Sequence, residues 1–193
     1  NSTEIEGKQS AFKASIVGAV KVKSIYKPYG VSIKNGKIYV SDVTLKGLDI
    51  IDLENNKFEY FKPQGRKQNL SLPLNSFIDS KGSLYVVDTR SHNIKVYDNN
   101  LTYVTTFGED TNINPTDIFI KNNKIYVTDT KQKRVNIYHQ DTKKFIDYFP
   151  KTVIGNDDYL SAPTNIFITD TRIYVTDLGS TNVKVYSLNT EHI

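Results

Sequence analysis

Asn114-Pro-Thr-Asp-Ile-Phe-Ile120 leads through the polar turn Lys121-Asn-Asn-Lys124 into Ile125-Tyr-Val-Thr-Asp129. A proline, an apolar run, a short polar turn and a second apolar run predict a β-hairpin. The same pattern starts at three other prolines, and the second strand then reads Ile38-Tyr-Val-Ser-Asp42, Leu84-Tyr-Val-Val-Asp88 and Ile173-Tyr-Val-Thr-Asp177. The sequence therefore predicts four copies of one hairpin.

A third strand ends nine residues after each aspartate, reading Leu48-Asp-Ile-Ile51, Ile94-Lys-Val-Tyr97, Val135-Asn-Ile-Tyr138 and Val183-Lys-Val-Tyr186. A fourth strand follows in three copies, at residues 57–61, 103–107 and 144–149. The prolines at 28, 73, 115 and 163 are 45, 42 and 48 residues apart, a spacing typical of four-stranded propeller blades. Apolar residues alternate with a period of two, and helical periodicity is absent. We therefore expect an all-β chain folded as a β-propeller of four-stranded antiparallel blades.

The repeated motif of Pro-x-x-Ile, turn, Ile/Leu-Tyr-Val-x-Asp and Ile/Val-x-Val-Tyr resembles the NHL-repeat family of β-propellers. The resemblance covers residues from about 27 to 190. It implies four NHL-like repeats, whereas propellers of this family most often have six blades. We expect residues 1–10 to be a flexible N-terminal segment and residues 11–193 to be a single NHL-like propeller domain.

The two ends of the chain suggest how four blades could close into a ring. Phe12-Lys-Ala-Ser-Ile-Val-Gly18 is similar to the outer strand Tyr103-Val-Thr-Thr-Phe-Gly108, and the last repeat stops after its third strand. An N-terminal strand paired with the last blade would remove the open edges of the sheets. The alternatives are a fragment of a larger propeller and an arc whose edges pair with other copies.

The composition excludes several kinds of site and segment. The 193 residues contain no Cys, which excludes disulfides and thiolate metal sites. No stretch approaches the roughly 18 apolar residues of a membrane span. The chain also lacks Met, and a chain without either sulfur residue suits an oxidising setting, so we expect an extracytoplasmic or secreted protein.

Four aspartates occupy one equivalent position, which invites a metal or acid–base interpretation. An aspartate between a strand and a turn more often accepts hydrogen bonds from backbone N–H groups and holds the turn. We therefore expect a structural, turn-holding role for Asp42, Asp88, Asp129 and Asp177. The three histidines, at positions 92, 139 and 192, are not expected to converge on a metal. The sequence predicts no catalytic residue, no metal ligand and no cofactor.

The loops between second and third strands differ most among the copies, and in propellers they share a face with the connections that enter each blade. The basic side chains expected on that face are Lys46, Arg66, Lys67, Arg90, His92, Lys131, Lys133 and Arg134. The formal net charge of +4 permits contact with an acidic partner. A solvated rim is the simpler interpretation, because lysines also decorate the opposite face.

These observations favour a non-enzymatic NHL-like propeller that acts as a protein-binding or assembly scaffold through its basic loop face. A protein partner or self-association is expected, nucleic acid could bind the same face, and no membrane span is predicted. The resemblance also allows two alternatives. One is a metal-dependent propeller enzyme, a lyase or a lactonase-like hydrolase, and the other is a propeller that binds single-stranded RNA.

Overall fold

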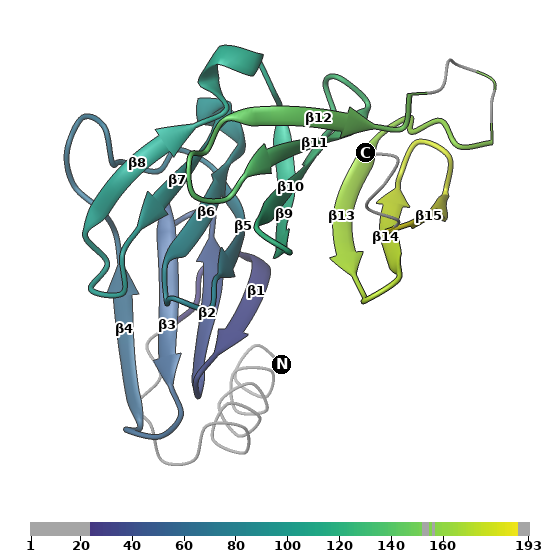
Figure 1. The fold of residues 1–193 in the computed structure, drawn as a ribbon. Coiled ribbons are helices and arrows are strands. Elements are labelled where there is room, and N and C mark those ends of the chain that lie inside the picture. The colour runs from purple at the N-terminus through teal and green to yellow at the C-terminus, as the bar shows by residue number, and fades with distance from the viewer. Residues whose placement is uncertain (1–23, 152–154, 156, 189–193) are drawn as a thin grey trace, which may run out of the picture.

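A computed structural model describes residues 24–151, 155 and 157–188, which form four antiparallel sheets arranged as propeller blades (Figure 1). Blade 1 contains β1 (Pro28–Lys34), β2 (Lys37–Asp42), β3 (Gly47–Asp52) and β4 (Lys57–Phe61). Blade 2 contains β5 (Pro73–Ile78), β6 (Leu84–Asp88), β7 (Asn93–Tyr97) and β8 (Tyr103–Phe107). The expected all-β, four-bladed fold is confirmed.

The remaining two blades follow the same order. Blade 3 contains β9 (Pro115–Lys121), β10 (Lys124–Asp129), β11 (Arg134–His139) and β12 (Phe145–Phe149). Blade 4 contains β13 (Pro163–Ile168), β14 (Arg172–Asp177) and β15 (Asn182–Ser187), so three strands of this sheet lie in the described residues. Two short 3-10 helices, η1 (Thr89–Ser91) and η2 (Glu109–Thr111), lie in the loops.

The blades follow one another along an arc. The first strands β1, β5, β9 and β13 contact each other in that order, and blades 1 and 4 stand at its two ends (Figure 1). The expected flexible segment 1–10 and the expected closing strand 12–18 lie outside the described residues. Both stay predictions.

Each blade packs one face on the next blade, and we call this its forward face and the opposite one its backward face. Tyr85, Ile94 and Val96 on the forward face of blade 2 pack with Ile118 and Val127 on the backward face of blade 3. Tyr85 and Tyr126 are buried, as are the third-strand residues Tyr97 and Tyr138. These four tyrosines of blades 2 and 3 therefore belong to the core between blades.

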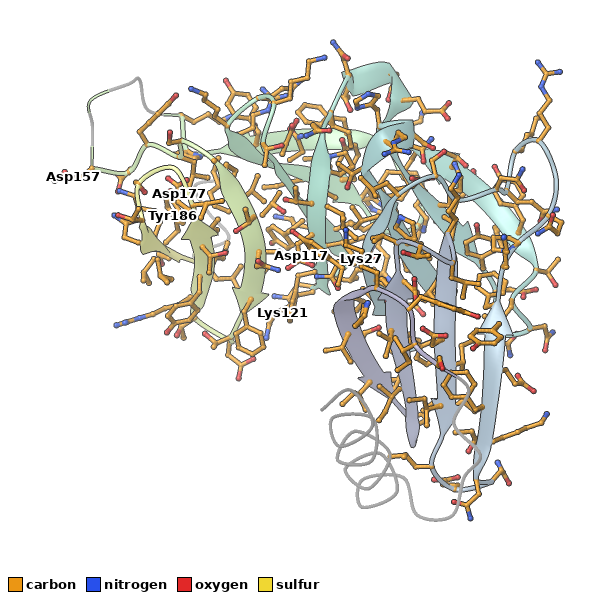
Figure 2. All side chains as sticks on the ribbon, turned by 180° about the vertical axis from the view of Figure 1, so that it is seen from behind. Lys27, Asp117, Lys121, Asp157, Asp177 and Tyr186 are labelled. Atoms are coloured by element: carbon orange, nitrogen blue, oxygen red, sulfur yellow. The ribbon has the colours of Figure 1, made fainter. Side chains whose placement is uncertain are left out.

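Asp117 links three of the first strands near the centre of the molecule (Figure 2). Its Oδ1 accepts hydrogen bonds from Asn75 Nδ2 at 2.6 Å and from the Ile118 N–H at 2.8 Å. Its Oδ2 accepts one from the Ile166 N–H at 2.9 Å. One buried carboxylate thus ties blades 2, 3 and 4 together.

Candidate functional site

The turn between the second and third strands contacts the incoming loop of its own blade in all four blades. The Thr89 N–H donates to the Leu72 carbonyl at 3.1 Å, and the Thr130 N–H donates to the Asn114 carbonyl at 3.2 Å. Val43 and Leu178 donate in the same way to Lys27 and Ala162. These turns and incoming loops therefore share one end of the molecule, which we call the loop face.

The four repeated aspartates join the turn to the incoming loop. The Asp42 carboxylate accepts hydrogen bonds from the N–H groups of Tyr26 and Lys27 in the loop and of Thr44 and Leu45 in the turn, at 2.7–3.0 Å. Burial acts to raise the pKa of Asp42, but these four donors outweigh it and the pKa is lowered. The equivalent carboxylates accept backbone N–H bonds from their own incoming loops, and they are Asp88, Asp129 and Asp177.

A groove of about 740 Å³ opens on the loop face of blade 2. Arg66 and Lys67 of the incoming loop line it, together with Lys95 from β7 and Glu109 from η2. The groove therefore brings together two of the basic residues expected from the sequence and one, Lys95, that the sequence analysis did not select. Its hydroxyl and amide side chains come from Asn69, Ser71, Ser91, Asn93, Tyr103, Thr105 and Thr106.

Lys95 is a charged side chain held in the wall of this groove, and it is only 5% exposed. Its Nζ donates to Asn93 Oδ1 at 3.1 Å and lies 3.9 Å from Asp88 Oδ2. Burial lowers the pKa of Lys95, and the charges of Asp88 and Glu109 oppose that shift. The Asn93 amide in turn donates to Glu109 Oε1 at 2.9 Å, so the groove wall is a connected polar network.

A sequence signal for Lys95 did exist. The third residue of the third strand is polar in every copy, although its two neighbours are apolar, and the four residues are Asp49, Lys95, Asn136 and Lys184. A polar side chain repeated in the middle of a buried strand needs a partner.

Asp49, at this position in blade 1, is fully buried, and neither of its carboxylate oxygens has a hydrogen-bond partner in the described part of the chain. Burial raises the pKa of Asp49 to about 7, and the charge of Asp42 acts in the same direction. The counterpart in blade 3 is satisfied, because Asn136 Nδ2 donates to Asp129 Oδ2 at 3.0 Å. Blade 1 thus places two carboxyl groups where blade 3 has an amide and a carboxylate.

The other basic residues predicted for the loop face do not line this groove. Arg90 is exposed in η1, beside Ser91 at the groove margin. The His92 Nδ1 lies 2.9 Å from the Ile113 carbonyl oxygen, which fixes the ring against the incoming loop of blade 3. Lys46 occupies the blade 1 turn, with a left-handed φ of 56°.

The three basic residues of blade 3 contact neighbours within the protein. Lys131 Nζ donates to Asn112 Oδ1 at 2.7 Å. Arg134 Nε donates to Asn136 Oδ1 at 2.7 Å, and its guanidinium lies 4.0 Å from the centre of the Tyr148 ring. The Lys133 Nζ lies 5.7 Å from the centre of the Tyr159 ring. This part of the loop face is basic but already engaged in internal contacts.

Within residues 24–151, 155 and 157–188, no group of three His, Cys, Asp or Glu side chains is placed to hold a metal ion. His92 and His139 lie in different blades, and His192 lies outside the described residues. Likewise, the described chain contains no helix that is long and apolar enough to cross a membrane.

Neither a protein-family model nor a curated protein matches this sequence. Solved structures of similar fold include a streptogramin B lyase, 16% identical with a TM-score of 0.63, where the match covers 85% of this chain and 55% of the lyase. BamB from Moraxella catarrhalis is 13% identical with a TM-score of 0.61, and the match covers 81% of this chain and 42% of BamB. The computationally designed protein Ika4 is 8% identical with a TM-score of 0.60, and the match covers 86% and 96%. The chain is therefore a β-propeller by fold, and it spans about half the length of the lyase and of BamB.

Proposed function

We propose that this β-propeller is a non-enzymatic scaffold that binds an acidic segment of a protein partner in the blade 2 groove. The observation that carries the proposal is the convergence of Arg66, Lys67 and Lys95 on one groove of the loop face. Arg66 and Lys67 lie on a loop, and loops on a rigid propeller are the elements free to vary for binding.

The charges of the groove favour an acidic ligand. Its lining holds three basic side chains and one carboxylate, that of Glu109. Arg66 and Lys67 are exposed and can meet a partner directly, whereas Lys95 is buried and its charge is partly offset by the Asp88 carboxylate, 3.9 Å from its Nζ. Arginine suits this task because its planar guanidinium binds a carboxylate through two parallel hydrogen bonds.

The test measures binding of a glutamate-rich peptide of about 20 residues by fluorescence anisotropy at low and moderate salt. Replacing both Arg66 and Lys67 with serine is expected to weaken binding by roughly tenfold, with an upper limit of about thirtyfold, since each exposed charge pair contributes up to about 1 kcal/mol. The matched control replaces Lys81 and Lys144, two exposed lysines at the opposite end of the blades, with serine. It removes the same charge, and binding is expected to stay within about twofold of the unmodified protein.

Equal losses in the two double variants would contradict the proposal, because binding would then follow net charge alone. A parallel titration with single-stranded poly(U) separates the two classes of polyanion. Tighter binding of poly(U) than of the peptide, with the same dependence on Arg66 and Lys67 and a steep salt dependence, would favour the RNA-binding alternative.

The proposal also includes the repeat family and the compartment of the protein. The chain is an NHL-like propeller, which rests on the four-fold recurrence of the motif that ends in Asp42, Asp88, Asp129 and Asp177. It works in an extracytoplasmic or secreted setting, which rests on the lack of Cys and Met. The likeness to a lyase extends to the fold and carries no activity to this chain.

A further inference from the structure

Lys95 is a buried ammonium at a position where the other blades place different groups. In blade 3 the equivalent residue is Asn136, which is fully buried and donates to Asp129 Oδ2 at 3.0 Å. In blade 4 it is Lys184, which is half-buried and donates from Nζ to the Asp157 carbonyl. Blade 2 instead places Lys95, only 5% exposed, in the wall of a groove of about 740 Å³. The departure of blade 2 from the repeat therefore coincides with its groove.

The Lys95 ammonium has hydrogen-bonding capacity left for a ligand. In the described residues its Nζ has one acceptor within hydrogen-bond distance, Asn93 Oδ1 at 3.1 Å. Asp88 Oδ2 is 3.9 Å away and already accepts hydrogen bonds from the Ser71 N–H and from the Ser91 hydroxyl. Because an ammonium carries three N–H donors, two of them remain for whatever occupies the groove.

A hydroxyl group lies beside this ammonium. Thr106 on β8 is paired with Lys95 on β7 in the sheet register, so the two side chains share one face of the sheet, with Cβ atoms about 5 Å apart. Both residues line the groove. Thr106 Oγ1 is 2.9 Å from the Tyr103 hydroxyl oxygen, and when the Tyr103 hydroxyl donates in this bond the Thr106 O–H can donate to a ligand. The groove wall thus offers an ammonium and a hydroxyl as neighbouring donors.

A carboxylate is the ligand group that matches these donors. It carries two oxygens that accept several hydrogen bonds and donate none. Of the described residues that line the groove, Glu109 is the one with a carboxylate, and its Oε1 already accepts from the Asn93 amide. Burial lowers the pKa of Lys95, because the charged form is penalised away from water. A carboxylate bound to Nζ would offset that penalty.

We propose that one glutamate of the acidic partner inserts its side chain into the groove, where Lys95 Nζ and the Thr106 hydroxyl donate to its carboxylate. Glutamate suits the site because its side chain is one CH₂ longer than that of aspartate, and Lys95 is only 5% exposed. The exposed pair Arg66 and Lys67 adds attraction, whereas Lys95 and Thr106 determine specificity. The inference rests on the proposed function, because it names the side chain that the same groove recognises in the same partner.

Binding of the glutamate-rich peptide, measured by fluorescence anisotropy, tests the role of Lys95. Lys95→Met retains an unbranched side chain without the ammonium and should weaken binding at least about tenfold, since charge-assisted hydrogen bonds are among the strong ones. Lys184→Met is the matched control, because it removes the same charge at the equivalent position of blade 4. Its affinity should stay within about twofold of the unmodified chain. Circular dichroism checks that both variants are folded.

The salt dependence separates a direct contact from general attraction. Salt screens exposed charges more strongly than buried pairs, so the contribution of Arg66 and Lys67 should shrink between about 0.05 and 0.5 M NaCl. The dissociation constant of Lys95→Met should stay at least about tenfold above that of the unmodified chain at both salt concentrations. A ratio that falls to one at high salt would overturn the proposal, because Lys95 would then act through its long-range charge alone.

A second variant and a second peptide cover the case in which Lys95→Met does not fold. Thr106→Val removes the hydroxyl at nearly constant volume and should weaken binding about threefold or more. An aspartate-rich peptide of the same length and charge should bind the unmodified chain at least about threefold more weakly than the glutamate-rich one. Unchanged binding by Thr106→Val, or equal affinity for the two peptides, would overturn the insertion.

Failure of the insertion can be told apart from failure of the proposed function. If the serine double variant of Arg66 and Lys67 loses affinity while Lys95→Met binds within twofold of the unmodified chain, the acidic segment binds at the exposed pair and the insertion is refuted. If the unmodified chain does not bind the glutamate-rich peptide, the proposed function and the insertion fail together.

Discussion

Replacing Asp49 with asparagine should stabilise the protein, and the gain should grow with pH. The carboxyl group of Asp49 is buried without a hydrogen-bond partner in the described residues, and its pKa is raised from 3.8 to about 7. An acid whose pKa is higher in the folded state stabilises the fold fully below the unfolded value, and that contribution is lost as the pH rises through about 7. Asparagine at position 49 removes the titrating group. Its amide is expected to donate to Asp42 in blade 1, as Asn136 donates to Asp129 at 3.0 Å in blade 3.

The magnitude follows from the shift. The pKa of Asp49 rises by roughly three, and each pKa unit corresponds to 1.36 kcal/mol, so the complete titration can change the free energy of unfolding by at most about 4 kcal/mol. Relaxation and water penetration around a buried charge reduce the effect to about 2 kcal/mol between pH 4.5 and pH 8. At pH 8 the asparagine variant is therefore expected to unfold with a free energy about 2 kcal/mol above that of the unmodified chain, and most of this advantage should disappear at pH 4.5.

The assay is urea denaturation at both pH values and constant ionic strength, with Asp110→Asn as the control that removes an exposed carboxylate. The control should show less than about 0.5 kcal/mol of change at either pH. Identical pH dependence for the unmodified chain and Asp49→Asn would refute the reasoning, because Asp49 would then not be the group that titrates.

Three other changes test how the blades are held. Asp117→Asn should destabilise the fold by about 1–3 kcal/mol in thermal or urea unfolding, because an amide cannot accept from the N–H donors on both sides as the carboxylate does. Asp129→Ala should cost a similar amount and increase hydrogen exchange at the Asn114 and Lys131 amides that it binds, whereas unchanged exchange there would contradict its role in the turn. Lys133→Gly should raise the melting temperature, since Lys133 has a left-handed φ of 57° and glycine relieves about 1 kcal/mol of strain.

The repeat made the fold predictable from sequence, whereas the groove required tertiary structure. Period-two alternation and the spacing of the prolines determine the blades because each blade is built from contacts within about 45 residues. The groove depends on a loop around Arg66 meeting the middle of a strand at Lys95, and no local pattern reports that meeting. Alternation likewise places Val185 on a blade face, but only the arrangement of blades shows that nothing in the described residues covers it.

The sequence also could not show which basic side chains are bound to neighbours within the protein. Arg134 is a basic residue beside a variable loop and was therefore expected to bind a partner. Its guanidinium instead lies against the Tyr148 ring, and its Nε donates to Asn136. Lysine and arginine in variable loops look alike in a sequence, whether they face solvent or satisfy a neighbour. Whether such a side chain is free to bind a partner depends on whether the fold places an aromatic ring or a hydrogen-bond acceptor next to it.

The aspartate that fastens each turn to its incoming loop also governs how the chain reaches its native state. In every blade the carboxylate bonds loop amides only 15 to 17 residues earlier, so each tie closes a short loop at little entropic cost. Contacts of such low sequence separation favour rapid, blade-by-blade folding. The part of an incoming loop that lies outside these hydrogen bonds can therefore be lengthened or exchanged without disturbing the contacts that form first. New binding specificities can arise on the loop face while the blades stay the same.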